Sequence, residues 1–178
     1  MKQESSQFAI KNMKSNLIIC SFILFISVHL QGQSLGIAFQ KAKEIGITTE
    51  HLDSVYKNAI HSDTSRAVFK DSVKQMQLQR AYGQFLQSFG SFLSKNNFKW
   101  ERKTPCFNRI YISPDGTVDY FLYHFTTKNV KQEDQITEDK KAEFERLLNQ
   151  FIKENKFPMV ADVKFAQCSP VSYNDKTK

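Results

Sequence analysis

Few residues of this chain have side chains that could do chemistry, and they are widely spaced. Past residue 34 the histidines are His51, His61 and His124, and none has a second histidine or a cysteine at metal-ligand spacing. His124 could act as a general base, but a histidine within a strand more commonly makes an ordinary hydrogen bond. None of the motifs HExxH, GxSxG, CxxC, GxGxxG and the Walker loop occurs past residue 34. The sequence therefore predicts no metal and no cofactor.

The remaining candidates for catalysis are a hydroxyl and three carboxylates. Ser113 and Asp115 fall in a Ser-Pro-Asp-Gly turn, where local hydrogen bonding accounts for both residue types. Asp119 and Glu143 could pair only through a fold contact that the sequence does not predict. The sequence thus favours a non-catalytic protein. The alternative is a secreted hydrolase or enzyme inhibitor with its site between helices and sheet.

Residues 1–34 have the pattern of a secretory signal peptide. Lys11 and Lys14 precede the apolar run 17–30, and small and polar residues follow it. The run is shorter than the roughly 20 residues of a membrane-spanning helix, so a retained anchor is the less favoured alternative. Cleavage after Gly32 or Ser34 fits the small-residue requirement. We therefore expect a periplasmic or secreted protein with no stable membrane span after cleavage.

The charge of the chain bears on its partners. Removing residues 1–34, which hold three Lys and one Glu, reduces the formal net charge from +7 to +5. The basic residues are interleaved with acidic ones, which is typical of a solvated surface rather than of a nucleic-acid interface. We expect a protein or peptide partner and no nucleic acid.

The fold is predicted to change character near residue 97. Residues 35–97 contain no proline, and apolar spacings of three and four predict helices over about 35–47, 49–60 and 65–95. The aromatic residues of the third helix indicate a packing face, with a ligand groove as the alternative. This helical segment would be followed by a module of different type.

Residues 98–173 are predicted to form a ββαβ module, and residues 174–178 a tail. Strands over 107–112 and 117–126 flank the turn, a helix begins at Thr137, and a third strand spans Val160–Cys168. A right-handed crossover would place the first strand in the middle. The prediction is an α+β protein with a three-stranded antiparallel sheet of strand order 2-1-3.

This topology has two consequences. It brings Cys106 and Cys168 to the same end of the sheet, which predicts a disulfide in an oxidising compartment, with two free thiols as the alternative. It also leaves the strand 160–168 at an edge, where its unpaired peptide groups must either be protected or pair with an extended peptide.

The order of these elements resembles the C-terminal domain of TonB-type proteins over about residues 105–173. The features are the Ser-Pro-Asp-Gly-Thr-Val turn between two strands, Phe144-Glu-Arg in the helix, the Phe157-Pro158 pair and the final strand. Unlike TonB energy transducers, this chain has no long proline-rich spacer and only a short apolar run, so the resemblance implies binding rather than energy coupling. It implies partner contacts along the last strand, at Val160, Ala161, Asp162, Val163, Lys164, Phe165 and Ala166.

Overall fold

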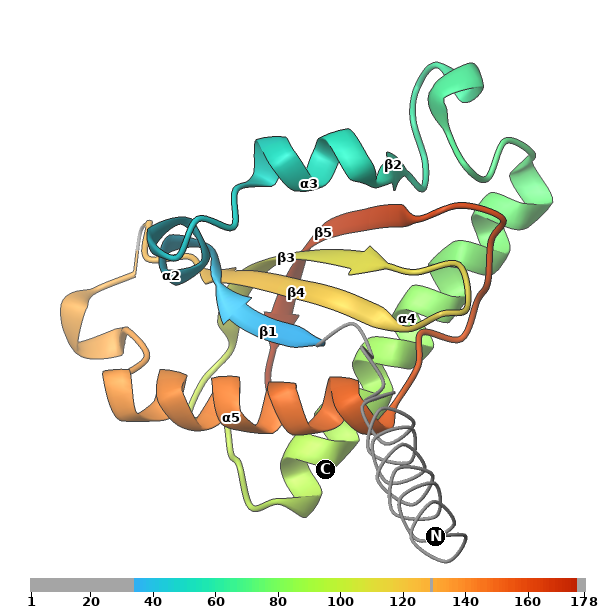
Figure 1. Ribbon diagram of the computed structural model, residues 1–178. Helices are drawn as coiled ribbons and strands as arrows, with labels where there is room; N and C mark the ends of the chain where they lie inside the picture. Colours follow the sequence, from blue (N-terminus) through green and yellow to red (C-terminus); the bar gives the residue numbers. More distant parts are fainter. Residues whose placement is uncertain (1–33, 129, 176–178) are drawn as a thin grey trace, which may run out of the picture. The chain divides into compact units, whose positions relative to one another are not determined.

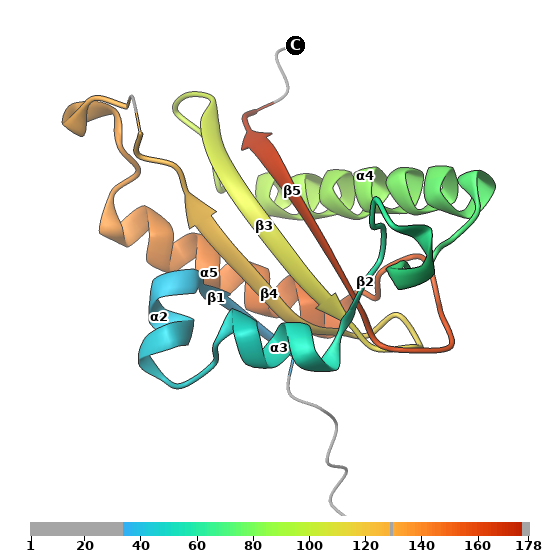
Figure 2. The same ribbon diagram turned by 90° about the horizontal axis from the view of Figure 1, so that it is seen from above.

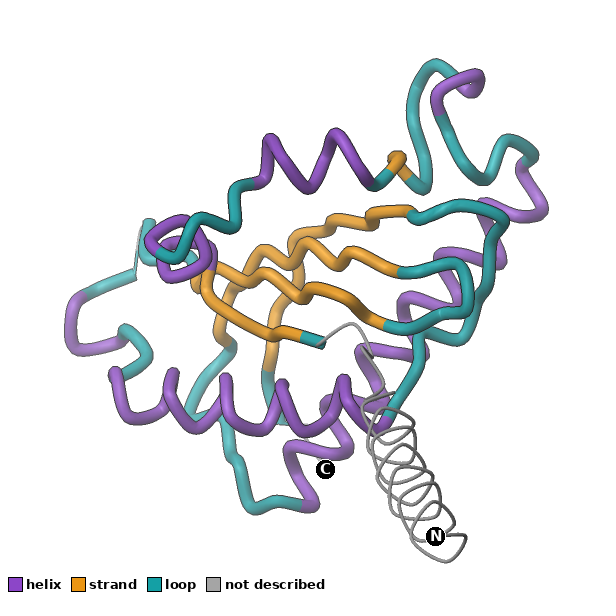
Figure 3. Tube along the Cα trace, viewed as in Figure 1, coloured by secondary structure: helices purple, strands orange, loops and turns teal. Residues whose placement is uncertain are grey.

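The computed structural model describes residues 34–128 and 130–175, so the predicted signal peptide lies outside the described residues except for Ser34 (Figure 1). Figure 3 shows the same chain by secondary structure. The elements in chain order are β1 (Leu35–Ala38), α2 (Phe39–Glu44), α3 (Thr49–Val55), β2 (Lys57–Asn58), η1 (Thr64–Arg66), α4 (Ser72–Lys95), β3 (Thr104–Ile112), β4 (Val118–Phe125), η2 (Gln132–Asp134), α5 (Glu138–Glu154) and β5 (Phe165–Tyr173).

The strands form one mixed sheet of order β1-β4-β3-β5-β2. The pairs β3–β4 and β3–β5 are antiparallel, whereas β1 runs parallel to β4 and β2 parallel to β5. The α+β class is confirmed, but the prediction of a three-stranded antiparallel sheet of order 2-1-3 is wrong. Two short strands from the segment predicted to be wholly helical pair with β4 and β5, which makes the sheet five-stranded and mixed.

Helices cover both faces of the sheet (Figures 1 and 2). The larger core lies under α4 and α5, and a smaller core lies under α2 and α3. The largest fully buried side chains of the first core are Tyr123, Phe89, Phe121, Phe144, Phe151, Phe157, Phe165, Leu78, Leu93, Ile110 and Ile112. The second core contains Ile37, Ala42, Leu52, Tyr56, Tyr111, Leu122 and Ala166. The face under α2 and α3 is covered over only part of its length, as Figure 2 shows.

The helix α5 follows the sequence pattern closely. All five apolar residues of the predicted stripe are buried, the Thr137 side chain accepts a hydrogen bond from the Lys140 N–H, and acidic residues occupy the first turn. The helix α4 begins later than predicted, at Ser72, with Asp71 as its N-cap. The residues just before it are not helical, and the Val68 and Phe69 N–H groups donate instead to the carbonyls of Asn58 and Ala59.

The predicted hairpin over the Pro-Asp-Gly turn is confirmed. The turn is also bound to the segment that follows α5. The Phe157 N–H donates to the Gly116 carbonyl (2.8 Å) and the Ala161 N–H to the Pro114 carbonyl (3.1 Å). The Lys156 ammonium lies 2.6 Å from Asp115 and, with Thr117, holds the pKa of that carboxyl at about 2. The hairpin therefore positions the chain that leads into β5.

The last strand lies five residues further along the chain than predicted. Residues 160–164 form a loop, and β5 extends to Tyr173, beyond the predicted end of the strand at Cys168. Cys106 pairs in register with Val171, while Cys168 lies opposite Arg109. Because side chains alternate between the two faces of a sheet, Cys106 and Cys168 are on opposite faces. The predicted disulfide is wrong, and both thiols are free.

The two thiols should differ strongly in reactivity. Cys106 is buried, its Sγ–H donates to Asn108 Oδ1 (3.3 Å), and burial raises its pKa to about 12, whereas Cys168 is exposed. We expect maleimide to label Cys168 in the native chain and Cys106 only after denaturation, as measured by peptide mass spectrometry. Labelling of native Cys106, or a Cys106–Cys168 disulfide in unreduced material, would contradict this arrangement.

Candidate functional site

The structure divides the predicted partner-binding residues between two environments. Val160 to Lys164 lie in the loop before β5, and the Val160 and Val163 side chains are 65% and 38% exposed. Phe165 and Ala166 are buried at the start of β5 and pair in register with β2. The loop can therefore meet a partner directly, but the first two residues of the strand cannot.

The outer edge of β5 beyond β2 is poorly suited to pairing with an extended peptide. The Ala59 N–H donates to the Ala166 carbonyl, so by alternation the peptide groups of Cys168, Pro170 and Ser172 also face outward. Pro170 has no N–H to offer, and its carbonyl accepts a hydrogen bond from Ser169 Oγ (2.9 Å). Gln167 Nε2 similarly covers the Cys168 carbonyl (3.1 Å). The chain thus protects this edge itself.

The opposite edge of the sheet is also protected. The Asn149 amide on α5 brackets Gly36 on β1, with Oδ1 accepting from the Gly36 N–H (2.9 Å) and Nδ2 donating to its carbonyl (2.6 Å). Glu145 accepts from the Ala38 N–H (3.2 Å) and from the Tyr123 hydroxyl (2.8 Å). These side chains of α5 take the place of a further strand. Neither sheet edge is therefore the best candidate site.

A groove of about 660 Å³ lies beside the loop that contains Val163. Its size falls in the range of known ligand sites. Four segments contribute to it: the end of α3 with β2, the stretch 65–70, β3 and the loop before β5. The lining residues are Asp53, Tyr56, Lys57, Asn58, Ser65, Arg66, Ala67, Val68, Lys70, Arg109, Asp162 and Val163. We call it the α3 groove.

Arg109 on β3 is held in place at the base of the α3 groove. Its Nη2 donates to Asp53 Oδ1 (2.5 Å), and its guanidinium lies 5.6 Å from the centre of the Tyr111 ring. The Tyr111 hydroxyl donates to the same Asp53 oxygen (3.0 Å), and burial raises the pKa of Tyr111 so that it remains a donor. Arg109 is thus a preorganised cation, with its side chain 20% exposed.

A second carboxylate fixes the wall of the groove. Asp119 Oδ2 accepts from the Tyr56 hydroxyl (2.7 Å) and from Ser113 Oγ (2.6 Å), and the Lys164 ammonium lies 3.7 Å away. The same ammonium lies 5.1 Å from the centre of the Tyr56 ring. Asp119 therefore ties the end of α3, the hairpin and the loop before β5 to one point. The arrangement is structural, because two hydroxyl hydrogen bonds and one ion pair converge on a single oxygen.

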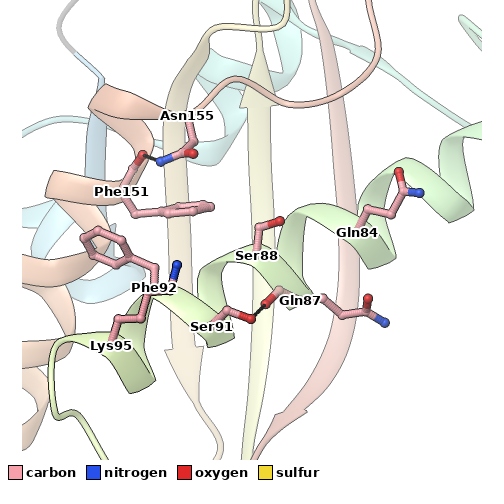
Figure 4. Close-up of a pocket in the computed structure, with 8 residues that line it drawn as sticks. All are labelled: Gln84, Gln87, Ser88, Ser91, Phe92, Lys95, Phe151 and Asn155. Atoms are coloured by element: carbon pink, nitrogen blue, oxygen red, sulfur yellow. Dashed lines mark hydrogen bonds between the residues drawn. The ribbon is translucent and has the colours of Figure 1, made fainter.

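A second groove, of about 460 Å³, lies between α4 and α5 (Figure 4). Phe92 and Phe151 pack against each other there, with ring centres 5.6 Å apart, and Lys95 is its only charged lining residue. The deeper aromatic residues of α4, Phe85 and Phe89, are buried in the core. The aromatic stripe is therefore mainly a packing face, and this groove offers few groups for specific recognition.

The other candidate catalytic residues do not lie close enough to one another to form a site. The His124 side chain is exposed on β4, beside Phe107, and makes no hydrogen bond to any described residue. Glu143 pairs with Arg146 on the exposed side of α5, whereas Asp119 is bound as described above. His61 Nδ1 accepts from the Asp63 N–H (3.0 Å) within its own turn.

The described part of the chain shows neither a metal-binding group nor a membrane-spanning helix. Residues 34–128 and 130–175 contain no group of three or more His, Cys, Asp or Glu placed to hold a metal ion. The helices in those ranges are all too short or too polar to cross a bilayer.

Sequence reasoning missed the basic residues of the α3 groove. Lys57, Arg66, Lys70 and Arg109 come from three segments separated along the chain, and none belongs to a run of like charges. The only signal was the excess of basic over acidic residues, which does not show where they gather. Asp162 and Val163, which line the groove, were among the predicted partner-binding residues.

No protein-family model, curated protein or solved structure matches the chain. The resemblance of residues 105–173 to the C-terminal domain of TonB-type proteins therefore stays a prediction.

Proposed function

We propose that this chain is an exported, non-catalytic module that binds a protein or peptide partner at the α3 groove. The export follows from the predicted signal peptide, and the binding role from the resemblance to a periplasmic peptide-binding domain. The observation that carries the proposal is the groove itself, which is open, rimmed by the exposed Val163 and backed by the fixed Arg109.

The proposal uses the groove rather than the strand edge that the sequence first suggested. At the outer edge of β5, Pro170 has no N–H to donate. The side chains of Gln167 and Ser169 already donate hydrogen bonds to outward-facing carbonyls. In the groove, Lys57, Asn58 and Val163 are not enclosed by the core. Side chains of a partner can thus reach polar and apolar groups together, which is the usual composition of a recognition site.

Site-specific crosslinking tests the proposal. We expect the chain with a photo-crosslinking residue at Val163 to form a discrete adduct with one partner in an envelope extract, because Val163 lies on the groove rim. The control places the same residue at Ile45, which is 63% exposed in the turn after α2 and does not line the groove. The purified partner should then bind Val163→Asp at least about tenfold more weakly than the parent chain.

Two results would contradict the proposal. One is capture of the same proteins from Val163 and Ile45, which would show nonspecific contact. The other is an isolated partner whose affinity is unchanged in Val163→Asp.

A further inference from the structure

The α3 groove is lined by more positively than negatively charged side chains. Four cationic side chains line it against two carboxylates. One carboxylate, Asp53, is already paired with Arg109 and accepts a hydrogen bond from Tyr111. Asp162 alone remains to offset Lys57, Arg66 and Lys70. We propose that the groove recognises an acidic peptide segment, an inference that rests on the proposed function and names the chemistry of its partner.

Arg109 supports this inference by its unused hydrogen-bonding capacity. Its Nε is buried and has no hydrogen-bond partner among residues 34–128 and 130–175. A buried donor of this kind costs free energy until it is satisfied. Asp53 takes one Nη2 hydrogen bond, which leaves most of the five guanidinium N–H groups without a carboxylate. Because the side chain as a whole is 20% exposed, a ligand carboxylate in the groove can accept from the terminal guanidinium N–H groups that Asp53 leaves free.

The three remaining cations line the same groove as Arg109. Lys57, Arg66 and Lys70 are exposed, and no ion pair joins any of them to a described carboxylate. Opposite charges of a ligand therefore need not displace an existing pair. The carboxylate of Asp63, close to Arg66 in the chain, accepts hydrogen bonds from the Ser65 N–H and Oγ instead.

The other lining residues favour a peptide over a free inorganic anion. Val163, Val68 and Ala67 give the groove an apolar side, while Asn58 and Ser65 add neutral polar groups. An inorganic anion would use only the cations. A peptide with carboxylates next to apolar side chains would use all three kinds of surface, and the groove volume of about 660 Å³ accommodates several side chains.

Fluorescence anisotropy with the full chain tests the inference. The probes are a rhodamine-labelled peptide of alternating Glu and Val and its counterpart of alternating Gln and Val. We expect the Glu peptide to bind about tenfold or more tightly than the Gln peptide, with the difference shrinking as salt is raised. The double variant Lys57→Glu/Lys70→Glu should weaken binding of the Glu peptide about tenfold or more.

The matched control is Lys128→Glu/Lys153→Glu, which makes the same charge change at exposed lysines outside the groove. We expect it to weaken binding less than about twofold, since distant surface charges are screened. Equal affinity for the two peptides, or equal loss in both double variants, would overturn the inference. Displacement of the peptide by inorganic phosphate well below the ionic strength at which chloride displaces it would assign the site to small anions instead.

These outcomes separate the inference from the proposed function. A partner captured at Val163 that binds Lys57→Glu/Lys70→Glu as tightly as the parent chain leaves the proposed function standing and overturns the acidic-peptide inference. Crosslinking that fails to distinguish Val163 from Ile45 overturns the proposed function itself.

Discussion

Replacement of Gly116 by alanine is expected to destabilise the chain by about 3 kcal/mol. Gly116 has φ +85° in the hairpin turn, and a Cβ there would lie 2.6 Å from the Phe157 carbonyl oxygen. A left-handed backbone costs a non-glycine residue about 1–2 kcal/mol, and the overlap with backbone adds a similar amount. Relief of the overlap would strain the hydrogen bond from the Phe157 N–H to the Gly116 carbonyl (2.8 Å). Urea unfolding followed by the fluorescence of Trp100, the single tryptophan, measures the change.

Gly46 provides the control for this prediction. It has nearly the same φ, +83°, but a Cβ added there meets no atom within 4 Å. Gly46→Ala should therefore cost only the left-handed backbone conformation, about 1–2 kcal/mol. Equal destabilisation by the two variants would show that the turn does not pack against the Phe157 segment as described.

Replacement of Phe144 by alanine should lower the free energy of unfolding by about 3–5 kcal/mol. Phe144 on α5 is fully buried. Its ring lies within 6.1 Å, centre to centre, of six other aromatic rings, those of Phe89, Phe98, Trp100, Tyr123, Phe125 and Tyr173. Such a cluster cannot collapse into the space left by one ring without losing the contacts among the others. The loss is a large part of the 5–15 kcal/mol that stabilises a typical domain.

Phe107 on β3 is the control for Phe144. Its side chain is only partly buried, on the incompletely covered face of the sheet, and one ring contact is described for it, with Phe39 at 6.0 Å. Phe107→Ala should cost about 1 kcal/mol in the same urea titration. A loss as large as that of Phe144→Ala would contradict the description of where the main core lies.

The hairpin and α5 could be predicted because local signals determine them. The Pro-Asp-Gly turn specifies its own backbone, and Gly116 indeed has a positive φ. In α5 the apolar spacing, the Thr137 cap and the acidic first turn all agree. The turn both connects β3 to β4 and binds residues 156–161 on their way to β5.

The outer strands could not be predicted because long-range contacts determine them. The four residues Leu35–Ala38 are too few to show a strand period, and their apolar spacing continues into α2. They become a strand because β4 pairs with them on one side and Asn149 brackets Gly36 on the other. The two residues of β2 are likewise defined only by their pairing with β5.

The displacement of the last strand also explains why the predicted disulfide is wrong. Val160 and Val163 suggested a strand by composition, but the hydrogen bond from the Ala161 N–H to the Pro114 carbonyl fixes that stretch as a loop. Pairing with β3 then starts at Phe165 and shifts every later residue. Cys168 thereby moves to the face opposite Cys106, and residues 160–164 lie in a loop instead of along a strand edge.

The most direct test of the account is NMR chemical-shift mapping of the full chain during titration with the alternating Glu and Val peptide. The central claim is that the α3 groove is the binding surface. It predicts the largest shifts at the backbone amides of Lys57, Arg66, Arg109 and Val163, and none at the α4–α5 groove around Ser88 and Phe151. Shifts concentrated at Ser88 and Phe151, or along Cys168–Ser172 at the β5 edge, would contradict the claim.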